Sequence, residues 1–350
     1  MGECMQPAAI KVSLVTTILN DREGCSDFLR QMELQTSIPD EIVMVDAGSK
    51  DGTWELLQNY RPARDYSLRV LQEIGCNIAR GRNLAITKAK NDIIVSTDVG
   101  CIWEPLWLEE LARPLLADNR FDAVMGSWMV RKEDLKGIWS KAEYALLNEP
   151  KLISTGISHS SSRSIAYRKS LWTAIGGYPE DLTLAADDMV FILLLHKLTD
   201  RVGYAPVPRC YWQRPVTLRS FIKETLRNFR GAGEAGIWHS YGIMVGGRLF
   251  LEILFCVLGS LFLFFPLLNR AGIFFLAALL ALFGLRIARL VPAIQRFNSN
   301  ECSSGWVIIP FFEYMVKFYG VLGYWRGFLY GYKHCKKCRD RLRGAKINLW

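Results

Sequence analysis

Residues 1–240 alternate short apolar runs with stretches whose apolar positions have helical spacing, a pattern typical of strands joined by crossover helices. Five runs that are β-branched or continuously apolar are predicted as strands: residues 12–18, 41–45, 68–72, 92–97 and 123–130. Sheets built in this way bind their ligands beyond the carboxyl ends of the strands. The pattern therefore predicts an α/β domain at residues 11–240, preceded by an N-terminal tail at residues 1–10.

Two apolar segments follow this domain. Residues 249–268 contain Glu252 as their only charge, and residues 271–290 contain two arginines near their end. Each segment is long enough to cross a hydrocarbon layer of about 30 Å, and the link between them is so short that they form a hairpin. We therefore predict a transmembrane hairpin at residues 245–292, which returns the chain to the side that it left.

A third stretch, residues 305–332, is aromatic but interrupted by Glu313, Lys317 and Arg326. Its broken apolar run predicts an interfacial or membrane helix. The alternative to a membrane hairpin is a buried helical hairpin of a soluble protein, which would have to cover two adjacent apolar stretches of about twenty residues.

Basic side chains at the end of the chain orient this region. Residues 333–350 hold seven lysines and arginines against one acid, Asp340, a bias that faces the cytoplasm. Because a hairpin keeps both flanks on one side, we predict a multi-pass membrane protein with a basic cytoplasmic tail and its N-terminal domain on the cytoplasmic face. Membrane lipids near the tail explain the net charge of +9 without a nucleic-acid partner.

Composition narrows the class of protein further. Half of the residues are hydrophobic and 22% are charged, which excludes a disordered, collagen-like or coiled-coil chain. The nine cysteines are scattered and too few for a disulfide framework. A reducing compartment is therefore expected.

Acidic residues stand at the predicted ligand edge of the sheet. Asp46 and Asp98 follow two predicted strands, and Asp187 and Asp188 open an apolar helix. A sheet can bring such carboxylates around one pocket, where they accept hydrogen bonds from a base or ribose, or hold Mg²⁺ or Mn²⁺ through oxygen. Taken singly, each acid is also explained as a turn residue or a helix cap.

In order and spacing, four motifs within residues 10–233 resemble family 2 glycosyltransferases: Asp46-Ala47-Gly48-Ser49, Arg80-Gly81-Arg82-Asn83, Thr97-Asp98-Val99-Gly100, and Gly176-Gly177-Tyr178-Pro179-Glu180 followed by Asp187-Asp188. The resemblance is to a membrane-anchored member of that family. It implies the α/β GT-A fold, a Rossmann-like domain that binds a nucleotide-sugar, followed by a C-terminal region of transmembrane helices.

The resemblance also implies roles for single residues. Asp46 would contact the donor base, Arg82 the nucleotide, and Asp98 the ribose or the metal-bound diphosphate. Thr17, in the first predicted strand, joins this donor-binding group. Asp188 would be the catalytic base that takes the proton of the acceptor hydroxyl.

Two positions depart from the family pattern. Gly100 stands where the second acid of the Asp-x-Asp motif is usual, so Asp98 remains as the metal ligand. A divalent cation, Mg²⁺ or Mn²⁺, is expected as cofactor, and this departure leaves metal dependence open. Asp187 replaces the Glu of the family's Glu-Asp pair, which leaves Asp188 in place.

Arginines are candidates to neutralise a leaving diphosphate. We place Arg163 and Arg227 in the donor-binding group for this reason, the alternative being a basic face toward lipid head groups. Processive polymer synthases of the family carry Gln-x-x-Arg-Trp, whereas residues 224–228 read Glu-Thr-Leu-Arg-Asn. This departure argues against a polymer-extruding synthase.

Together the motifs predict an inverting glycosyltransferase that moves a sugar from a nucleotide-sugar donor to a membrane-associated acceptor, lipid-linked or saccharide, in glycan or glycolipid biosynthesis. Two alternatives stay open. A non-catalytic, membrane-tethered module that binds nucleotide or saccharide is supported by Gly100. A nucleotidyltransferase with a GT-A-like fold would release pyrophosphate instead of a nucleoside diphosphate.

Overall fold

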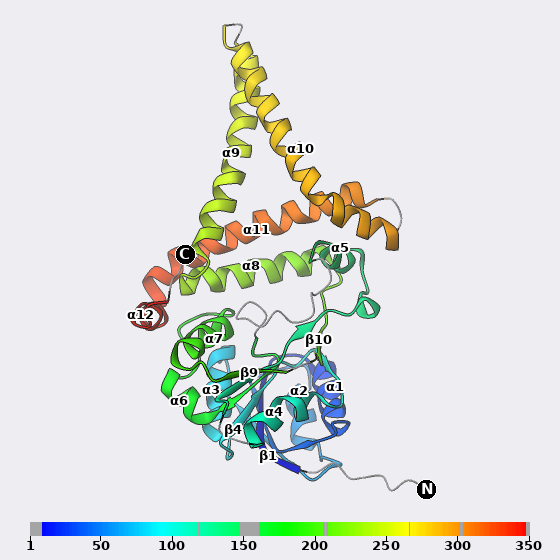
Figure 1. Ribbon diagram of the computed structural model, residues 1–350, viewed down its shortest axis with the longest axis vertical. Helices are drawn as coiled ribbons and strands as arrows, with labels where there is room; N and C mark the ends of the chain where they lie inside the picture. The colour runs from blue at the N-terminus through cyan, green and yellow to red at the C-terminus, as the bar shows by residue number, and fades with distance from the viewer. Residues whose placement is uncertain are drawn as a thin grey trace. The chain divides into compact units, whose positions relative to one another are not determined.

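The structure is a computed structural model that describes residues 9–117, 120–147, 161–205, 207, 209–265, 267–301 and 304–347. The chain forms two compact units (Figure 1). The first consists of the described residues of Met1–Asp134, Pro150–Arg214 and His334–Ile347, and the second of those of Leu135–Glu149 and Pro215–Lys333.

A mixed sheet of seven strands forms the centre of the first unit, in the order β3-β2-β1-β4-β8-β6-β9. Its strands are β1 (Ala9–Ile18), β2 (Ile38–Asp46), β3 (Ser67–Gln72), β4 (Ile93–Ser96), β6 (Ala123–Met125), β8 (Ile165–Arg168) and β9 (Val202–Tyr204). The first four in sequence pair in parallel, as predicted, while β8 runs antiparallel to both of its neighbours.

Helices of the first unit are α1 (Arg22–Glu33), α2 (Thr53–Asn59), α3 (Ile78–Lys88), α4 (Trp107–Ala117), α6 (Lys169–Ile175), α7 (Asp187–Leu198) and α12 (Lys336–Gly344). Helix α3 is capped at its start by Asn77, whose side chain accepts a hydrogen bond from the Arg80 amide at 2.8 Å. It packs against β1 and β2, and Gly81 lies so close to Thr17 that a Cβ would meet the threonine methyl. The start of α3 is thereby held at the carboxyl end of β1.

The strand predicted over residues 123–130 is wrong in its extent. The chain leaves the large sheet after β6, and β7 (Trp128–Met129) pairs instead with β10 (Cys210–Trp212) in a second sheet of order β5-β10-β7, whose first strand is β5 (Cys101–Trp103). The break falls at Gly126, where a Cβ would meet the Ser164 hydroxyl and the Leu111 side chain. Packing therefore favours glycine at the break, through contacts that hydropathy does not record.

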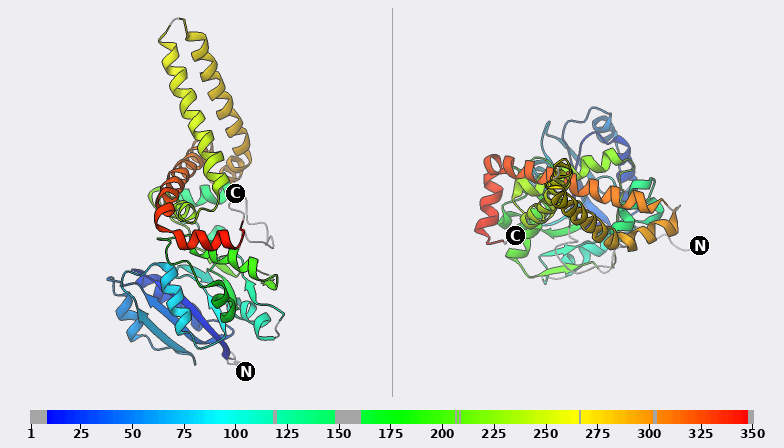
Figure 2. Two further views of the ribbon diagram at one scale, coloured as in Figure 1. Left: turned by 90° about the vertical axis from the view of Figure 1, so that its left-hand side faces the viewer. Right: turned by 90° about the horizontal axis from the view of Figure 1, so that it is seen from above.

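The second unit is helical. Its helices are α5 (Ile138–Leu147), α8 (Leu218–Ala235), α9 (His239–Leu263), α10 (Asn269–Asn300) and α11 (Gly305–His334). Helices α9 and α10 run side by side as a hairpin (Figure 2). In the part of the chain that the structure describes, α9, α10 and α11 are long and apolar enough to span a membrane.

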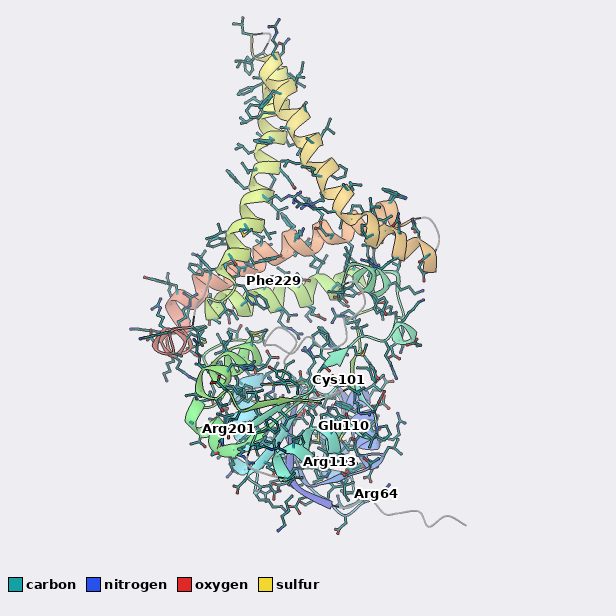
Figure 3. The ribbon with its side chains drawn as sticks, viewed as in Figure 1. Arg64, Cys101, Glu110, Arg113, Arg201 and Phe229 are labelled. Atoms are coloured by element: carbon teal, nitrogen blue, oxygen red, sulfur yellow. The ribbon has the colours of Figure 1, made fainter. Side chains whose placement is uncertain are left out.

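Helices α8 and α11 lie side by side in near-backbone contact (Figure 1). Gly323, Gly327 and Gly331 of α11 face the α8 backbone so closely that a Cβ at any of them would meet α8 backbone atoms. Next to this contact, Phe229 of α8, labelled in Figure 3, stacks on Tyr241 of α9 with ring centroids 4.5 Å apart. Small residues thus allow the two helices to pack tightly.

The compact units divide the chain differently from the ranges predicted by hydropathy. Helix α8 falls within the predicted domain 11–240 but belongs to the helical unit, and α12 falls within the predicted tail 333–350 but belongs to the unit of the sheet. The predicted ranges separate segments expected in the membrane from segments expected outside it, and they stay predictions. Of the predicted tail 1–10, residues 1–8 lie outside the described residues.

Candidate active site

Three of the predicted site residues meet at the carboxyl edge of the parallel strands because of register. Thr17 pairs with Val45, one position before Asp46, and Asp98 follows β4, which pairs with the other side of β1. Parallel strands end at the same edge of a sheet, so this placement follows from the predicted topology.

Arg82 of α3 connects two of the acids in the first unit. Its Nη2 donates to Asp98 Oδ1, and its Nη1 donates to Asp187 Oδ2. The Arg82 side chain is 3% exposed, and that of Asp187 is 7% exposed. A guanidinium so deeply buried is stable only with paired charges around it, which the two carboxylates supply.

A second arginine continues the network from Asp98. Arg163 Nε lies 3.7 Å from Asp98 Oδ2, and Arg163 Nη1 donates to Ser161 Oγ at 3.0 Å. The Ser161 hydroxyl in turn donates to Asp188 Oδ2 at 2.9 Å. Since Asp187 and Asp188 are adjacent in the chain, six residues form a closed ring, called the charge ring below: Arg82, Asp98, Ser161, Arg163, Asp187 and Asp188.

The two acids at the start of α7 have different surroundings. The pKa of Asp187 is raised to about 6, chiefly by burial, while the charge of Arg82 lowers it and the charges of Asp188 and Asp98 raise it. Asp188 is only half-buried, and its Oδ1 accepts a hydrogen bond from the Met189 amide at 2.8 Å. Asp188 is therefore the acid of the pair that is more accessible to a substrate hydroxyl.

Asp46 makes contacts that explain it as a turn residue. Its buried carboxylate accepts hydrogen bonds from the amides of Gly48 and Ser49, each at 3.0 Å, and from Gln72 Nε2 at 2.9 Å. These bonds hold the turn between β2 and α2, in which Gly48 has a φ of +99°. Contact of Asp46 or of the half-buried Thr17 with a donor base stays a prediction.

Arg227 does not belong to the unit that carries the charge ring. It is an exposed residue of α8 in the helical unit, and its part in donor binding stays a prediction.

Gly100 has a conformational reason to be glycine. Its φ is +92°, a backbone region that side chains disfavour, although no atom lies within 4 Å of where a Cβ would stand. The departure from the Asp-x-Asp pattern therefore accompanies a turn that favours glycine.

The side chains of the site fit a divalent cation only if the substrate phosphates supply most of its ligands. Within the described residues, no group of three or more His, Cys, Asp or Glu side chains could hold a metal ion. Mg²⁺ is commonly bound by one or two carboxylates together with substrate phosphates. Asp98, whose side chain is 30% exposed, fits that mode as a single protein ligand.

Aromatic rings support both arginines of the charge ring. The Arg163 guanidinium lies 4.2 Å from the centroid of the Trp212 ring, and Arg82 lies 5.4 Å from that of Tyr178. Tyr178 is 1% exposed and stacks on Phe191 of α7 at 4.2 Å. Sequence reasoning missed Tyr178 as a support and Ser161 as a link, because a serine-rich run does not indicate which hydroxyl reaches Asp188.

Comparison with known proteins identifies the domain. Residues 13–174 match the model of the family described as Glycosyl transferase family 2. The solved structure of the mannosyltransferase PcManGT from Pyrobaculum calidifontis, in complex with GDP-Man and Mn²⁺, is similar with a TM-score of 0.53 and 19% identity, over 87% of this chain and 85% of that one. The predicted α/β fold of the GT-A type is thereby confirmed.

Two curated proteins of known name are also similar to this chain in sequence. Poly-beta-1,6-N-acetyl-D-glucosamine synthase of Staphylococcus aureus (strain COL) is 23% identical over 248 residues, which cover 69% of this chain and 60% of the relative. Undecaprenyl-phosphate 4-deoxy-4-formamido-L-arabinose transferase of Pseudomonas savastanoi pv. phaseolicola is 29% identical over 182 residues, or 49% of this chain and 51% of the relative. The chain thus spans between half and two thirds of the length of these relatives.

Proposed function

Since residues 13–174 of this chain form a domain of glycosyl transferase family 2, we propose that the protein is an inverting glycosyltransferase. It moves a sugar from a nucleotide-sugar donor to an acceptor held at the membrane, in glycan or glycolipid biosynthesis. The observation that carries this proposal is the charge ring, which joins a half-buried carboxylate, Asp188, to two arginines at the ligand edge of the sheet.

The reaction makes opposite demands on the two sides of the sugar. The acceptor oxygen forms a bond to the anomeric carbon while the bond from that carbon to the donor phosphate breaks, and a nucleoside diphosphate leaves. Asp188 takes the acceptor proton as general base. A single displacement of this kind inverts the anomeric centre.

Charge balance supports a divalent cation in the same site. The charge ring holds two guanidinium groups, Arg82 and Arg163, against three carboxylates, so it has no surplus positive charge for a diphosphate. Bound through Asp98 and the donor phosphates, Mg²⁺ or Mn²⁺ would supply that charge. The structure of the similar mannosyltransferase is in complex with both GDP-Man and Mn²⁺.

The acceptor class rests on the relatives and on the helices. One relative is by name an undecaprenyl-phosphate transferase, and the other is by name a polysaccharide synthase. The three helices that are long and apolar enough to span a membrane support an acceptor held at the membrane, either lipid-linked or a growing saccharide. The motif Gln-x-x-Arg-Trp of processive polymer synthases is absent from residues 224–228, and this favours the lipid-linked acceptor over a growing polysaccharide.

Connectivity supports a membrane arrangement in which α9 and α10 cross and α11 does not. Helix α12 packs against α7 in the unit of the sheet, so both lie on one side of a membrane. The intervening chain must then cross an even number of times. The hairpin supplies two crossings, and α11 lies in the interface together with α8, while the basic tail puts this side in the cytoplasm.

The base assignment is tested by Asp188→Asn, with Asp200→Asn, an exposed acid just after α7, as matched control. We expect D188N to lower transfer at least about 1000-fold, because the amide cannot accept the proton. Binding of a nucleoside diphosphate, measured by thermal shift with and without Mn²⁺, should persist.

The purified protein is assayed for release of nucleoside diphosphate and of pyrophosphate. Turnover by D188N close to that of D200N would contradict the base assignment. Release of pyrophosphate instead of nucleoside diphosphate would contradict the reaction class and favour nucleotidyl transfer.

A further inference from the structure

Helix α12 is separated in sequence from the rest of its compact unit by residues 215–333 of the helical unit, yet it is packed as a core element. The side chains of Cys335, Cys338 and Leu342 are fully buried. Helix α12 packs against α7, the helix that begins with Asp187 and Asp188. A basic terminal segment that served only to contact lipid would not need such burial.

Arg341 of α12 binds the start of the loop that leads to α7. Its Nη2 donates to the carbonyl oxygens of Ile175 at 2.8 Å and Gly177 at 2.7 Å. These carbonyls lie where α6 ends, and the last carbonyls of a helix lack partners within the helix. Gly176 and Gly177 have φ values of +82° and +73°, which turn the chain there and leave both carbonyls to one guanidinium.

The other end of the same loop is held by the start of α12. Cys335 Sγ donates to the carbonyl oxygen of Asp181 at 2.9 Å, and the Cys338 amide donates to Asp181 Oδ2 at 2.9 Å. Helix α12 therefore holds residues 175–181 at both ends, through four hydrogen bonds.

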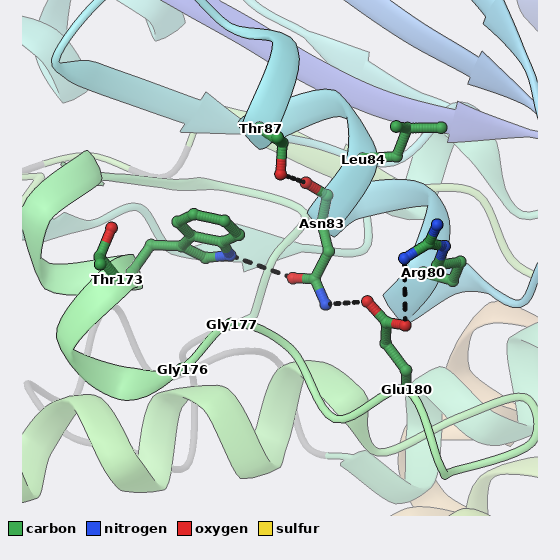
Figure 4. A pocket seen from close by; sticks show the side chains of 9 residues that line it. Arg80, Asn83, Leu84, Thr87, Thr173, Gly176, Gly177 and Glu180 are labelled. Atoms are coloured by element: carbon green, nitrogen blue, oxygen red, sulfur yellow. Dashed lines mark hydrogen bonds and ion pairs between the residues drawn. The ribbon is translucent and has the colours of Figure 1, made fainter.

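Helix α3 holds this loop through a different set of bonds. The side-chain amide of Asn83 donates to the Tyr178 carbonyl at 2.9 Å and to Glu180 Oε1 at 2.8 Å, and its oxygen accepts from the Tyr178 amide at 2.8 Å. Asn83 also accepts a hydrogen bond from Trp172 Nε1 at 3.0 Å. Figure 4 shows its bond to Glu180, on the wall of a cavity of about 380 Å³. The loop is thus fixed by two helices, one of which is α12.

The loop in turn supports the charge ring. Tyr178, at its centre, lies against Arg82 at 5.4 Å and against Phe191 of α7 at 4.2 Å, and its hydroxyl is 2.9 Å from Ser162 Oγ. A shift of the loop would displace the ring of Tyr178 and with it the partners of Asp187. Misplacement of a reacting group by about 1 Å can cost about 100-fold in rate.

We propose that Arg341 is a positioning residue for the transfer reaction: by binding the carbonyls of Ile175 and Gly177 it fixes the loop that supports Arg82 and the start of α7. This inference rests on the proposed function. It assigns to the segment after the last apolar helix a direct part in ordering the site. Arg341 touches no reacting atom and acts through the loop.

The test compares Arg341→Ala with Arg341→Lys and with Arg343→Ala, all in the full-length protein. Arg343 is the matched control, because it stands on the same helix with a 63% exposed side chain paired to Asp340. We expect R341A to lower kcat about 10- to 100-fold with a change of less than about 3-fold in the donor KM. R341K, which keeps one cationic donor, should recover part of kcat, and R343A should equal the wild type.

Hydrogen exchange of residues 175–182 provides a readout that does not depend on turnover. Faster exchange of this loop in R341A, with unchanged exchange in the sheet, is the expected result. Because R341A could unfold the unit, Asp181→Ala provides a second variant that removes only the acceptor of the Cys338 amide, and it should lower kcat in the same way. If R341A and D181A both keep kcat within about 2-fold of the wild type, or exchange at the same rate as the wild type, the inference is overturned.

The two proposals fail in distinguishable ways. A wild-type protein without transfer activity would contradict the proposed function, while the exchange measurement would still decide whether Arg341 orders the loop.

Discussion

The pairing of Arg82 with both Asp98 and Asp187 defines the site at the scale of single residues. The three side chains come from α3, from the turn after β4 and from the start of α7, and the two strong pairs leave the arginine almost without exposed surface. The family resemblance implies a nucleotide contact for Arg82. In the structure its guanidinium is occupied by acids, so a donor would have to share it with them.

The raised pKa of Asp187 predicts how the free energy of unfolding changes with pH. Its pKa is raised from 3.8 to about 6 in the folded protein, mainly by burial. Between about pH 4 and 6 the folded state therefore binds more protons than the unfolded state, and stability falls as pH rises through this window.

We expect Asp187→Asn to remove this contribution, so that its thermal midpoint falls less between pH 4.5 and 7 than that of the wild type. Thermal unfolding at several pH values measures the difference, with D200N as control for loss of an exposed carboxylate. An identical pH profile in wild type and D187N would contradict the assignment.

At the scale of elements, buried charges join the three apolar helices of the second unit. Arg286 of α10 is 4% exposed, with Nη1 3.1 Å from Glu252 Oε2 of α9 and Nε 3.4 Å from Glu313 Oε2 of α11. Its guanidinium also lies 4.9 Å from the Tyr314 ring centroid. Charged groups at such depth are costly unless paired, so one arginine links three helices.

Arg286→Met should destabilise this unit by about 2 kcal/mol, because each carboxylate loses one charged partner while Glu252 keeps Arg248 at 3.2 Å and Glu313 keeps Lys317. Thermal unfolding in detergent measures the loss. Arg270→Met, at the exposed start of the same helix, is the control and should have little effect. Equal midpoints for the two variants would show that the ion pairs do not stabilise the helices.

At the scale of the whole molecule, the chain leaves the unit of the sheet at Arg214 and returns to it at His334. In the proposed membrane arrangement, this return makes the number of crossings even. Without α12, the hydropathy of α11 alone would permit a third crossing and would put the two ends of the chain on opposite sides.

Tags placed before Met1 and after Trp350 should therefore be digested together. Protease added to sealed inside-out vesicles should remove both tags, and protease added to right-side-out vesicles should remove neither. Removal of only one tag in either preparation would contradict the two-crossing arrangement.

Part of this architecture could be predicted from local patterns. The acids Asp46 and Asp98 were expected at the ligand edge because strand periodicity and turn residues locate the ends of strands. The hydrogen bonds of Asp46 to its own turn agree with the alternative explanation of such an acid as a turn residue. The split at Gly126 was not predictable, since β7 pairs in the second sheet with β10, which lies far along the chain.

Local patterns predict the α/β order, the acids at the strand ends, the family resemblance and the apolar hairpin, because each depends on residues close together in the chain. The folded chain adds that Arg82 reaches Asp187, that Ser161 links Arg163 to Asp188, and that α12 returns to hold the loop before α7. Such contacts join residues distant in sequence, and their partners are chosen by packing and by the need to pair buried charge.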